Sequence, residues 1–446
     1  MAPRFQAPRG TRDLLPEDLG RWRWAEAQAR GVLERYGYGE IRTPLFEDFE
    51  LFARSSGESS DVVQKEMYRF KDLGERDLAL RPEFTAGVMR AYLERGLGGR
   101  TRIHRLWSAG PVFRYGRPQK GRYRQFSQIN CELVGSPAPG ADVEMITLFV
   151  DLYEAWGFRD LVVALNSVGQ PASRRAYGER LREWLAPVAG RLSDDSRRRL
   201  AGDESAGVAA NPLRVLDTKD EGDRALFREL GALPRLLDTV DAEDRAHWQA
   251  VLAGLDAAGI AYEVDHGLVR GLDYYTRTAF EVHDRSLGAQ SALGGGGRYD
   301  GLVAELGGPP TPGVGFAIGL DRAMLVLEER GIVTPAAPAG VYLVAMEATH
   351  AAALALAREL RRRFPVELDV EARSFGAQMK SAGRSGARLL VILGEDEWKR
   401  GEVAVKDLAT GTQETLARTD LAEALGARLA QAPSPARGGA KETERP

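Results

Sequence analysis

The sequence has almost none of the residues that form covalent or metal cross-links. Its 446 residues include one cysteine, Cys131, which excludes an internal disulfide and a thiolate cluster around zinc. The five histidines are scattered without ligand spacing, so no metal site built from protein side chains is expected. We therefore expect a protein of a reducing compartment and place it in the cytoplasm.

Long apolar runs and a strong net charge are also missing. No uninterrupted apolar stretch approaches the roughly 20 residues of a membrane helix. Met1–Asp13 has no apolar run typical of a signal peptide, and we expect no membrane contact. The net charge of -3 does not attract nucleic acid, so such binding would need a local basic patch. With 43% hydrophobic residues, the chain can build large cores in two or three domains.

Hydrophobic periodicity predicts a mixture of helices and strands before residue 335. The expected helices are Pro16–Tyr36, Ala86–Arg95 with Thr85 as N-cap, Asp142–Trp156 and Leu320–Arg330. The expected strands are Pro111–Tyr115 and Arg124–Val134, which form an antiparallel hairpin, then Arg277–His283 and Gly313–Gly319. The polar, arginine-rich residues 166–254 are interpreted as a helical insertion.

The pattern changes after a linker that is rich in proline and alanine at residues 335–338. Strands and helices alternate there, which favours a small α/β domain with a mostly parallel sheet. They are Val341–Ala345, Ala351–Arg363, Val366–Val370, a helix capped by Ser374, and Leu389–Leu393. The tail, Gln431–Pro446, has the composition of a disordered segment.

A basic cluster occupies the loop of the predicted hairpin. Five cationic residues lie within eleven positions: Arg114, Arg117, Lys120, Arg122 and Arg124. Guanidinium groups bind phosphate oxygens in a fork, so several on one loop can clamp a polyphosphate. A solvated, charged hairpin has the same composition, and the loop alone does not separate the two interpretations.

The strand after that loop favours a binding site. Period two places Ile129, Cys131 and Leu133 on one face, which we predict is core. The opposite face combines an aromatic ring, two amides and a carboxylate, from Phe126, Gln128, Asn130 and Glu132. A solvent-facing strand is similarly polar, but such a face beside a phosphate clamp is better explained as the floor of a site.

Three further segments have compositions that suit a ligand site. Residues 268–281 bring arginines, tyrosines and an aspartate together, although Tyr274 and Tyr275 fit ordinary packing equally well. The four glycines that begin residues 294–301 favour either close approach to a ligand or strand, or a flexible loop. They fit neither the dinucleotide fingerprint nor the P-loop. Residues 313–322 lead into a helix with Arg322 in its first turn, which favours anions, or else form a tightly packed joint.

Several long motifs occur together in an order that is typical of one family. They are Arg9–Asp13, Phe113–Arg114 with Arg122–Phe126, Leu268–Tyr275, Ala292–Asp300 and the segment that ends in Arg322. The chain resembles class II aminoacyl-tRNA synthetases, and within them the histidyl-tRNA synthetase family. The hairpin resembles the second class-defining motif, and the segment that ends in Arg322 resembles the third. Residues 268–275 and 292–300 resemble stretches that are particular to the histidine enzymes. The resemblance covers about residues 9–430.

The resemblance implies an α+β fold, in which an antiparallel six-stranded class II sheet flanked by helices precedes a C-terminal α/β anticodon-binding domain. We accordingly predict a catalytic domain at residues 1–334, with the insertion at about residues 166–254, and an anticodon-binding domain at residues 339–430. The family also implies a homodimer with the first class motif at its interface.

The resemblance assigns roles to individual side chains. The α-amino group of histidine would contact Glu83, Thr85 and Gln128. The imidazole nitrogens would contact Glu132 and Tyr275, with Phe84 and Tyr274 beside them. ATP would be held by Arg114 on the α-phosphate, Arg122 on the distal phosphates, and Phe126 and Arg322 around the adenine. Arg270 would join Arg114 and Arg322 in catalysis, and Gln119 would approach the acceptor end of the tRNA.

The implied activity is histidine–tRNA ligation, with ATP, L-histidine and tRNA(His) as substrates and Mg²⁺ accompanying ATP. Positioning and charge stabilisation would supply most of the catalysis. Three residues depart from the family pattern. Gly116 stands where the family usually has a glutamate that helps to recognise the adenine amino group. Phe84 stands where glycine is common, and Ser127 stands where histidine is common.

A different class of function is compatible with the same fold. Some bacteria carry a paralogue that serves as a histidine-binding regulatory subunit of ATP phosphoribosyltransferase and does not aminoacylate. Such paralogues typically lack the anticodon domain and the arginines of the phosphate clamp. Because this chain keeps Arg114, Arg122, Arg270 and Arg322, and has a predicted α/β domain after residue 339, the synthetase is favoured.

Overall fold

The computed structural model describes residues 5–57, 60, 62–118, 121–201, 212–218, 220–269, 274–285, 292–332 and 340–430. The chain forms two compact units, residues 1–334 and residues 335–446, which are described separately. The predicted linker and tail lie outside the described residues. Within the described part of the chain, no helix combines the length and apolar character needed to cross a bilayer.

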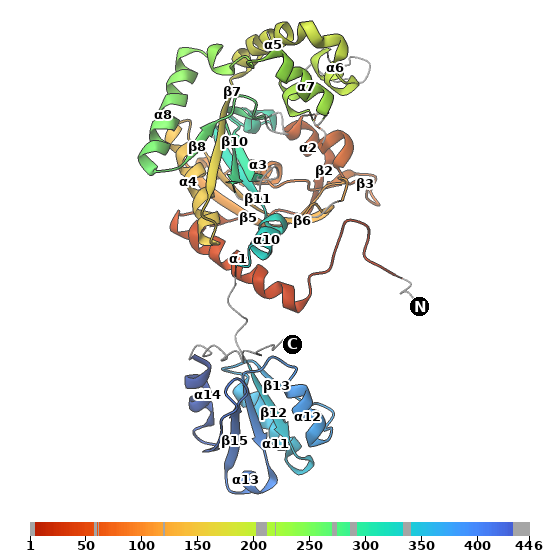
Figure 1. The fold of residues 1–446 in the computed structure, drawn as a ribbon, viewed down its shortest axis with the longest axis vertical. Coiled ribbons are helices and arrows are strands. Elements are labelled where there is room, and N and C mark those ends of the chain that lie inside the picture. The colour runs from red at the N-terminus through yellow and green to blue at the C-terminus, as the bar shows by residue number, and fades with distance from the viewer. Residues whose placement is uncertain are drawn as a thin grey trace, which may run out of the picture. The chain divides into compact units, whose positions relative to one another are not determined.

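An eight-stranded sheet forms the centre of the first unit (Figure 1). Its strands are β1 (Gly39–Glu40), β5 (His104–Phe113), β6 (Gln125–Val134), β7 (Leu161–Gly169), β8 (Tyr262–Val264), β9 (Thr276–Asp284), β10 (Ala292–Arg298) and β11 (Gly313–Gly319). Their spatial order is β1-β5-β6-β11-β10-β9-β7-β8. The six inner strands pair antiparallel, as the resemblance implies, and β1 and β8 add a parallel strand at each edge.

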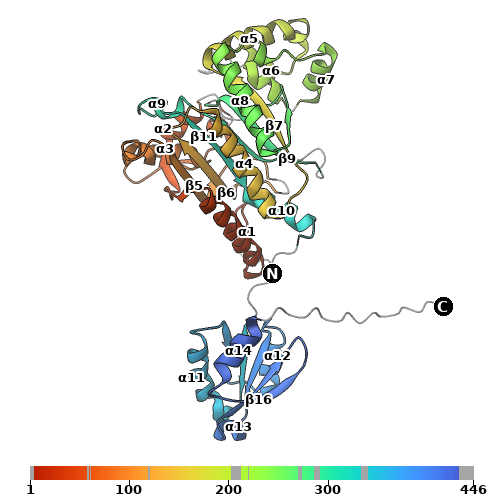
Figure 2. The same cartoon turned by 90° about the vertical axis from the view of Figure 1, so that its left-hand side faces the viewer.

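One face of this sheet is covered by the helices α1 (Pro16–Arg35), α4 (Pro139–Ala155), α8 (Ala242–Ala258) and α10 (Leu320–Glu329) (Figure 2). The predicted core residues Ile129, Cys131 and Leu133 pack against them, which confirms the period-two prediction for this strand. Phe149 of α4 stacks on Phe316 of β11 with ring centroids 4.4 Å apart. Burying each such ring stabilises the fold by about 1.5–3 kcal/mol.

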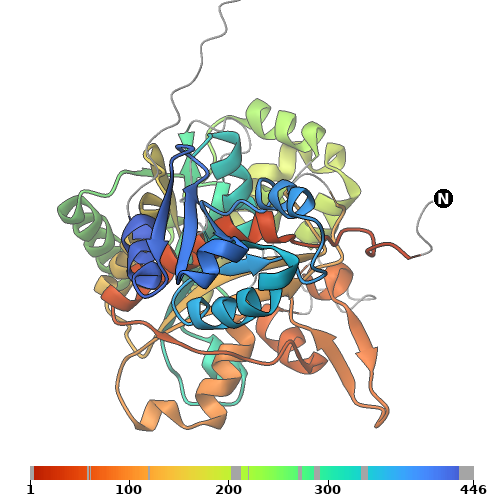
Figure 3. The same cartoon turned by 90° about the horizontal axis from the view of Figure 1, so that it is seen from below.

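The opposite face carries a smaller core and two short helices. These are α3 (Thr85–Glu94) and α9 (Leu302–Glu305), and nearby lie α2 (Phe49–Ser56), the π-helix η1 (Val62–Glu66) and the 3-10 helix η2 (Leu97–Gly99). A separate three-stranded sheet has the order β2-β4-β3, with β2 (Phe46–Asp48), β3 (Arg69–Lys71) and β4 (Asp77–Leu80). Its orange strands extend at the edge of the unit in Figure 3.

The start of α3 differs from the sequence prediction. Thr85 is the first helical residue and not the N-cap, because the carboxylate of Glu83 caps the helix instead. Its two oxygens accept hydrogen bonds from the backbone nitrogens of Thr85, at 2.6 Å, and Ala86, at 2.8 Å. A carboxylate at this position also interacts favourably with the helix dipole.

The hairpin begins earlier than expected, and the glycine run confirms one of its expected alternatives, close approach to a strand. Strand β5 begins at His104, seven residues before the predicted start at Pro111. Pro111 is tolerated because β1 pairs only with Leu106 and Trp107, which leaves the outer edge of β5 open at residue 111. The glycines at 294–297 are not a loop but lie in β10, between β9 and β11, so they allow close approach of strands.

The predicted insertion has different boundaries. Residues 166–169 belong to β7 of the main sheet, and α8 packs in the main core through Trp248, Val251 and Leu255. Between them, α5 (Pro171–Leu185), α6 (Asp194–Ala201) and α7 (Glu221–Leu230) have two small cores of their own. The 3-10 helices η3 (Ala186–Arg191), η5 (Pro212–Asp217) and η6 (Leu236–Asp238) complete this region. The periodicity of α8 does not reveal which core it joins.

The second unit is a five-stranded sheet with the order β13-β12-β14-β15-β16. Its strands are β12 (Val341–Ala345), β13 (Val366–Leu368), β14 (Leu389–Leu393), β15 (Glu402–Asp407) and β16 (Gln413–Ala417). Its helices are α11 (His350–Leu360), α12 (Phe375–Ala382), α13 (Glu395–Lys399) and α14 (Leu421–Ala430), with the 3-10 helix η8 (Glu347–Thr349). The first three strands in this order are parallel, as predicted, and β15 and β16 add an antiparallel hairpin that was not predicted.

Candidate active site

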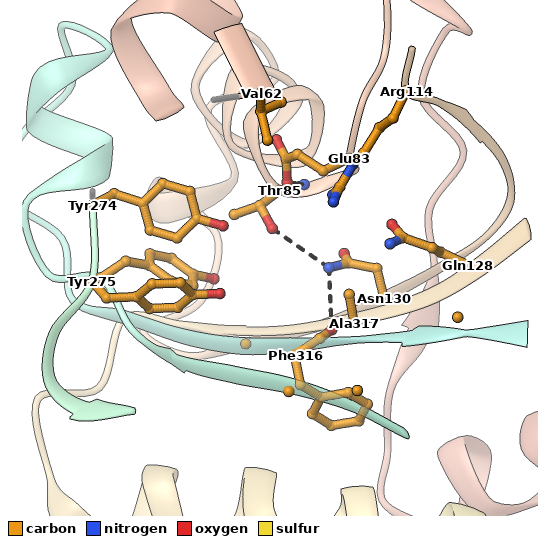
Figure 4. A pocket seen from close by; sticks show the side chains of 15 residues that line it. Val62, Glu83, Thr85, Arg114, Gln128, Asn130, Tyr274, Tyr275, Phe316 and Ala317 are labelled. Carbon is orange, nitrogen blue, oxygen red and sulfur yellow. Dashed lines mark hydrogen bonds between the residues drawn. The ribbon is translucent and has the colours of Figure 1, made fainter. Parts of the chain in front are cut away.

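A cavity of about 230 Å³ opens on the polar face of the main sheet (Figure 4). Strands β6, β10 and β11 form its floor, and the start of α3 and the segment before β9 form its walls. It is lined by Val62, Glu83, Thr85, Arg114, Gln128, Asn130, Tyr274, Tyr275, Gly294, Gly295, Tyr299, Gly315, Phe316, Ala317 and Gly319. Six of the predicted site residues are therefore brought together: Glu83, Thr85, Arg114, Gln128, Tyr274 and Tyr275.

The carboxylate of Glu83 stands at one wall of the cavity. Burial raises its pKa, although the hydrogen bonds from Ala86 and Thr85 act in the opposite direction. Beside it, Arg114 donates from Nε to the carbonyl of Pro82 at 2.8 Å, which fixes the guanidinium at the cavity edge (Figure 4). A carboxylate and a guanidinium side by side can bind the ammonium group and the carboxylate or phosphate of a small zwitterionic ligand.

The floor presents two amides with unused acceptors. Asn130 donates from Nδ2 to the carbonyl of Phe316 at 3.2 Å and to the hydroxyl of Thr85 at 3.5 Å. The side-chain oxygens of Gln128 and Asn130 are buried and have no hydrogen-bond partner among the described residues. Buried acceptors are nearly always paired in proteins, so these two oxygens point to a ligand with N–H donors.

Three tyrosines cluster at one side of the cavity, and one of them contacts the buried carboxyl of Glu132. The rings of Tyr274 and Tyr275 lie 4.6 Å apart, and Tyr274 meets Tyr299 edge-on at 5.7 Å. The hydroxyl of Tyr299 donates to Glu132. Glu132 does not line the cavity but lies beneath Gly315, where a Cβ would contact its carboxylate oxygen. Burial raises the pKa of Glu132 to about 8.

Tyr299 lines the cavity, but the sequence assigned it no role. It belongs to the motif at residues 292–300, and its partner, Glu132, is 167 residues away, so nothing local in the sequence indicated their contact. The arginine before it has a structural role. Arg298 is fully buried and forms an ion pair with Asp142 of α4, which ties β10 to the helical layer.

The remaining predicted nucleotide residues lie outside the lining of this cavity. Arg122 donates to Glu66 at 2.9 Å, and the guanidinium of Arg114 lies 5.8 Å from the ring centroid of Phe126. Arg322 occupies the first turn of α10, as predicted. The predicted roles of Arg270 and Gln119 fall on residues outside the described part of the chain.

The segment that contains Arg9–Asp13 contacts the same region. Arg12 forms a 2.9 Å ion pair with Asp321, which precedes Arg322, and Asp321 also accepts from the backbone of Ser127 at 2.7 Å. The guanidinium of Arg12 lies 4.6 Å from the ring centroid of Tyr123. This segment therefore joins the hairpin to the start of α10.

The three departures from the family pattern have different surroundings. Phe84 does not line the cavity, because its ring is buried in the smaller core beneath the guanidinium of Arg81. Ser127 contributes a backbone donor to Asp321, which any residue could supply. A Cβ at Gly116 would lie 3.2 Å from Arg122 and 3.5 Å from Glu66. The carboxylate of Glu66 therefore lies beside the position at which the family usually has a glutamate.

Comparison with known proteins decides the family. A model of the histidyl-tRNA synthetase family matches residues 10–323, and a model of the anticodon binding domain matches residues 339–428. The chain belongs to the histidyl-tRNA synthetase family. Among its relatives, the histidine–tRNA ligase of Synechococcus sp. (strain JA-3-3Ab) is 49% identical over 423 residues, which cover 94% of this chain and 98% of the relative.

Other members of the family agree over the same length. The histidine–tRNA ligase of Desulforamulus reducens is 44% identical and covers 94% of this chain and 99% of its own. The crystal structure of apo histidyl-tRNA synthetase from S. aureus is 36% identical with a TM-score of 0.78, over 94% of this chain and 99% of that one. The similarity thus includes both compact units.

Proposed function

We propose that this member of the histidyl-tRNA synthetase family activates L-histidine with ATP in the cavity and transfers it to tRNA(His). The observation that carries the proposal is the meeting of Glu83, Arg114 and the unpaired amide oxygens of β6 in one cavity beside the tyrosines. These groups complement an amino acid with a nitrogen-rich side chain. The chain is an aminoacyl-tRNA synthetase by its family.

In this proposal the amino acid is held at both ends. Its ammonium group contacts Glu83, Thr85 and Gln128, and its imidazole ring faces Glu132 and Tyr275, with Tyr274 and Tyr299 packed beside them. A site that pairs both ring nitrogens rejects apolar side chains of similar size, since these would leave buried polar groups unpaired.

ATP enters as its magnesium complex, so Mg²⁺ is part of the substrate. Arg114 contacts the α-phosphate, Arg122 the distal phosphates, and Phe126 and Arg322 hold the adenine. An oxygen of the histidine carboxylate attacks the α-phosphorus, the bond to the bridging oxygen breaks, and pyrophosphate leaves. Arg114 and Arg270 stabilise the charge that develops on the α-phosphate.

The second step uses the tRNA. A ribose hydroxyl of the terminal nucleotide attacks the acyl carbon, the acyl–oxygen bond to the phosphate breaks, and AMP leaves. Gln119 approaches the acceptor end, and the unit at residues 340–430 reads the anticodon as unstacked bases. This anticodon-binding unit speaks against the regulatory paralogue of ATP phosphoribosyltransferase, which typically lacks it.

We further propose that two copies associate in the cytoplasm as a homodimer. The small sheet exposes the rings of Phe46 and Phe70, which meet edge-on with centroids 6.4 Å apart. Apolar groups that gather in this way are typical of an interaction surface. Analytical ultracentrifugation at micromolar concentration should give a dimer, and a monomer would contradict this part of the proposal.

The test of the function is pyrophosphate exchange into ATP without tRNA, with each of the twenty amino acids offered in turn. Exchange that depends on histidine alone, followed by charging of tRNA(His), is the expected result. Histidine binding without exchange for any amino acid would contradict the proposal and favour the regulatory paralogue.

A further inference from the structure

The first residues of β9 are not held in place by the sheet alone. The pairing register shifts on both sides of this end, between Gly297 and Arg298 on β10 and between Ser167 and Gly169 on β7. Arg277 has a φ of 49°, in the left-handed region that costs a residue with a side chain about 1–2 kcal/mol. Tyr274 and Tyr275, which line the cavity, immediately precede this irregular end.

Side chains of the helical region between β7 and β8 hold this end instead. Arg174 of α5 donates from Nη1 to the carbonyl oxygen of Tyr275 at 3.0 Å. Arg277 donates from Nε to Asp244 at 2.7 Å and from Nη2 to Glu243 at 2.5 Å, both in the first turn of α8. Asp244 also accepts from the backbone of Gln170 at 3.2 Å, which joins α5 and α8 at the same point.

The contact between Arg277 and Asp244 is shielded from water, so it holds its position more firmly than a surface ion pair would, whereas Glu243 is 80% exposed and adds less. Arg277 and Asp244 are 8% and 2% exposed. Arg174 also interacts electrostatically with Glu305 of α9: burial raises the pKa of Glu305, and the positive charge of Arg174 acts in the opposite direction. One arginine of the helical region thus acts on both the segment before β9 and the helix after β10.

We propose that the helical region is a positioning element of the histidine site, and that Arg174 and Arg277 are its positioning residues. Neither side chain lines the cavity. They set the backbone of Tyr275, and through it the hydroxyls that face the amino acid. The proposal rests on the assignment of the cavity to histidine activation.

Removing the hydrogen bond from Arg174 should affect the KM for histidine and the KM for ATP differently. The proposed ATP contacts come from the β5–β6 hairpin and from α10, whereas Arg174 donates to the backbone of Tyr275 just before β9. Losing the hydrogen bond from Arg174 should therefore raise the KM for histidine and leave the KM for ATP unchanged. A loss of overall folding would instead change both constants together with the thermal midpoint.

The test compares Arg174→Met with Arg175→Met, a matched substitution one residue along α5 at an exposed position. Histidine-dependent pyrophosphate exchange gives both KM values, and equilibrium dialysis with labelled histidine gives Kd without ATP. For Arg174→Met we expect KM and Kd for histidine to rise about tenfold, as the loss of one part-buried hydrogen bond from a charged donor predicts. The KM for ATP should stay within twofold, Arg175→Met should match the unmodified enzyme, and Arg174→Lys should restore part of the loss.

Other outcomes overturn the proposal. If neither KM changes in Arg174→Met, or if both rise equally, Arg174 has no positioning role at the histidine site. If Arg174→Met does not fold, Arg174→Gln, which keeps a shorter donor, is judged by the same two constants. Failure of the assigned function would look different, because the unmodified enzyme would then show no histidine-dependent exchange.

Discussion

The carboxyl of Glu132 is fully buried, and burial raises its pKa to about 8 from an ordinary value of 4.5. Between these two pH values the folded enzyme keeps a proton that the unfolded chain releases. The free energy of unfolding should therefore fall as pH rises through this window, by up to about 1.4 kcal/mol per pH unit. Glu132→Gln removes this titration, so its stability should change less between pH 5 and pH 8.

Urea unfolding at several pH values measures this difference. The matched control is Glu17→Gln, an exposed glutamate in the first turn of α1, which should keep the slope of the unmodified enzyme. Equal slopes for Glu132→Gln and the unmodified enzyme would show that Glu132 is ionised in the folded state at neutral pH. The same variant should bind histidine more weakly, since the amide replaces the proposed partner of the imidazole ring.

The positions of single residues were predictable where the alternation of polar and apolar side chains along one strand defines its two faces. The alternation of β6 placed Gln128 and Asn130 on the site face, and both line the cavity. The capping role of Glu83 and the bond between Tyr299 and Glu132 were not predictable, because each depends on backbone geometry or on a partner far along the chain. The tyrosines at 274 and 275 left packing and binding equally open, and the structure shows that they pack in the smaller core and also line the cavity.

At the scale of elements, β10 depends on glycine at position 296. A Cβ there would lie 2.0 Å from the carbonyl oxygen of Gly315 and 2.7 Å from the Cα of Phe316. Backbone atoms in the middle of a sheet cannot move aside, so Gly296→Ala should destabilise the enzyme by about 3 kcal/mol or more. Gly140→Ala is the control, because nothing lies within 4 Å of its Cβ in the first turn of α4.

Thermal and urea unfolding distinguish the two glycine variants. Gly140→Ala should leave the free energy of unfolding unchanged or raise it by less than about 1 kcal/mol, as alanine favours helix. A Gly296→Ala variant as stable as the control would show that β10 and β11 are not packed as closely as the structure has them.

The bounds of helices and strands were predictable where neighbouring residues in the sequence define them. Strands β11, β12 and β14 have the predicted bounds because each is a short apolar run that ends at a turn or a helix. Strand β10 was not predicted, since glycine disfavours strands unless neighbouring backbones need its space. The first half of β5 and the short edge strands have weak alternation, and only pairing with distant strands defines them.

At the scale of the whole molecule, the two compact units have separate cores. The buried clusters of residues 335–446 contain no residue of the first unit, and all residues that line the cavity lie between 62 and 319. Composition alone predicted this division, because the proline- and alanine-rich segment and the change to alternating strands and helices are both visible in the sequence. The eight-stranded sheet was less predictable, since its neighbouring strands are joined across long stretches of chain.

This division predicts the behaviour of a chain that ends at Thr334. Pyrophosphate exchange needs only histidine and ATP, so the shortened enzyme should keep histidine-dependent exchange within a few-fold of the full chain. Charging of tRNA(His) should lose about 100-fold in kcat/KM, equivalent to ~2.7 kcal/mol of lost tRNA contacts. Circular dichroism of the shortened chain provides the control for folding. A folded chain that has lost exchange would show that the second unit contributes to histidine activation, and one that charges tRNA normally would show that anticodon contacts add little.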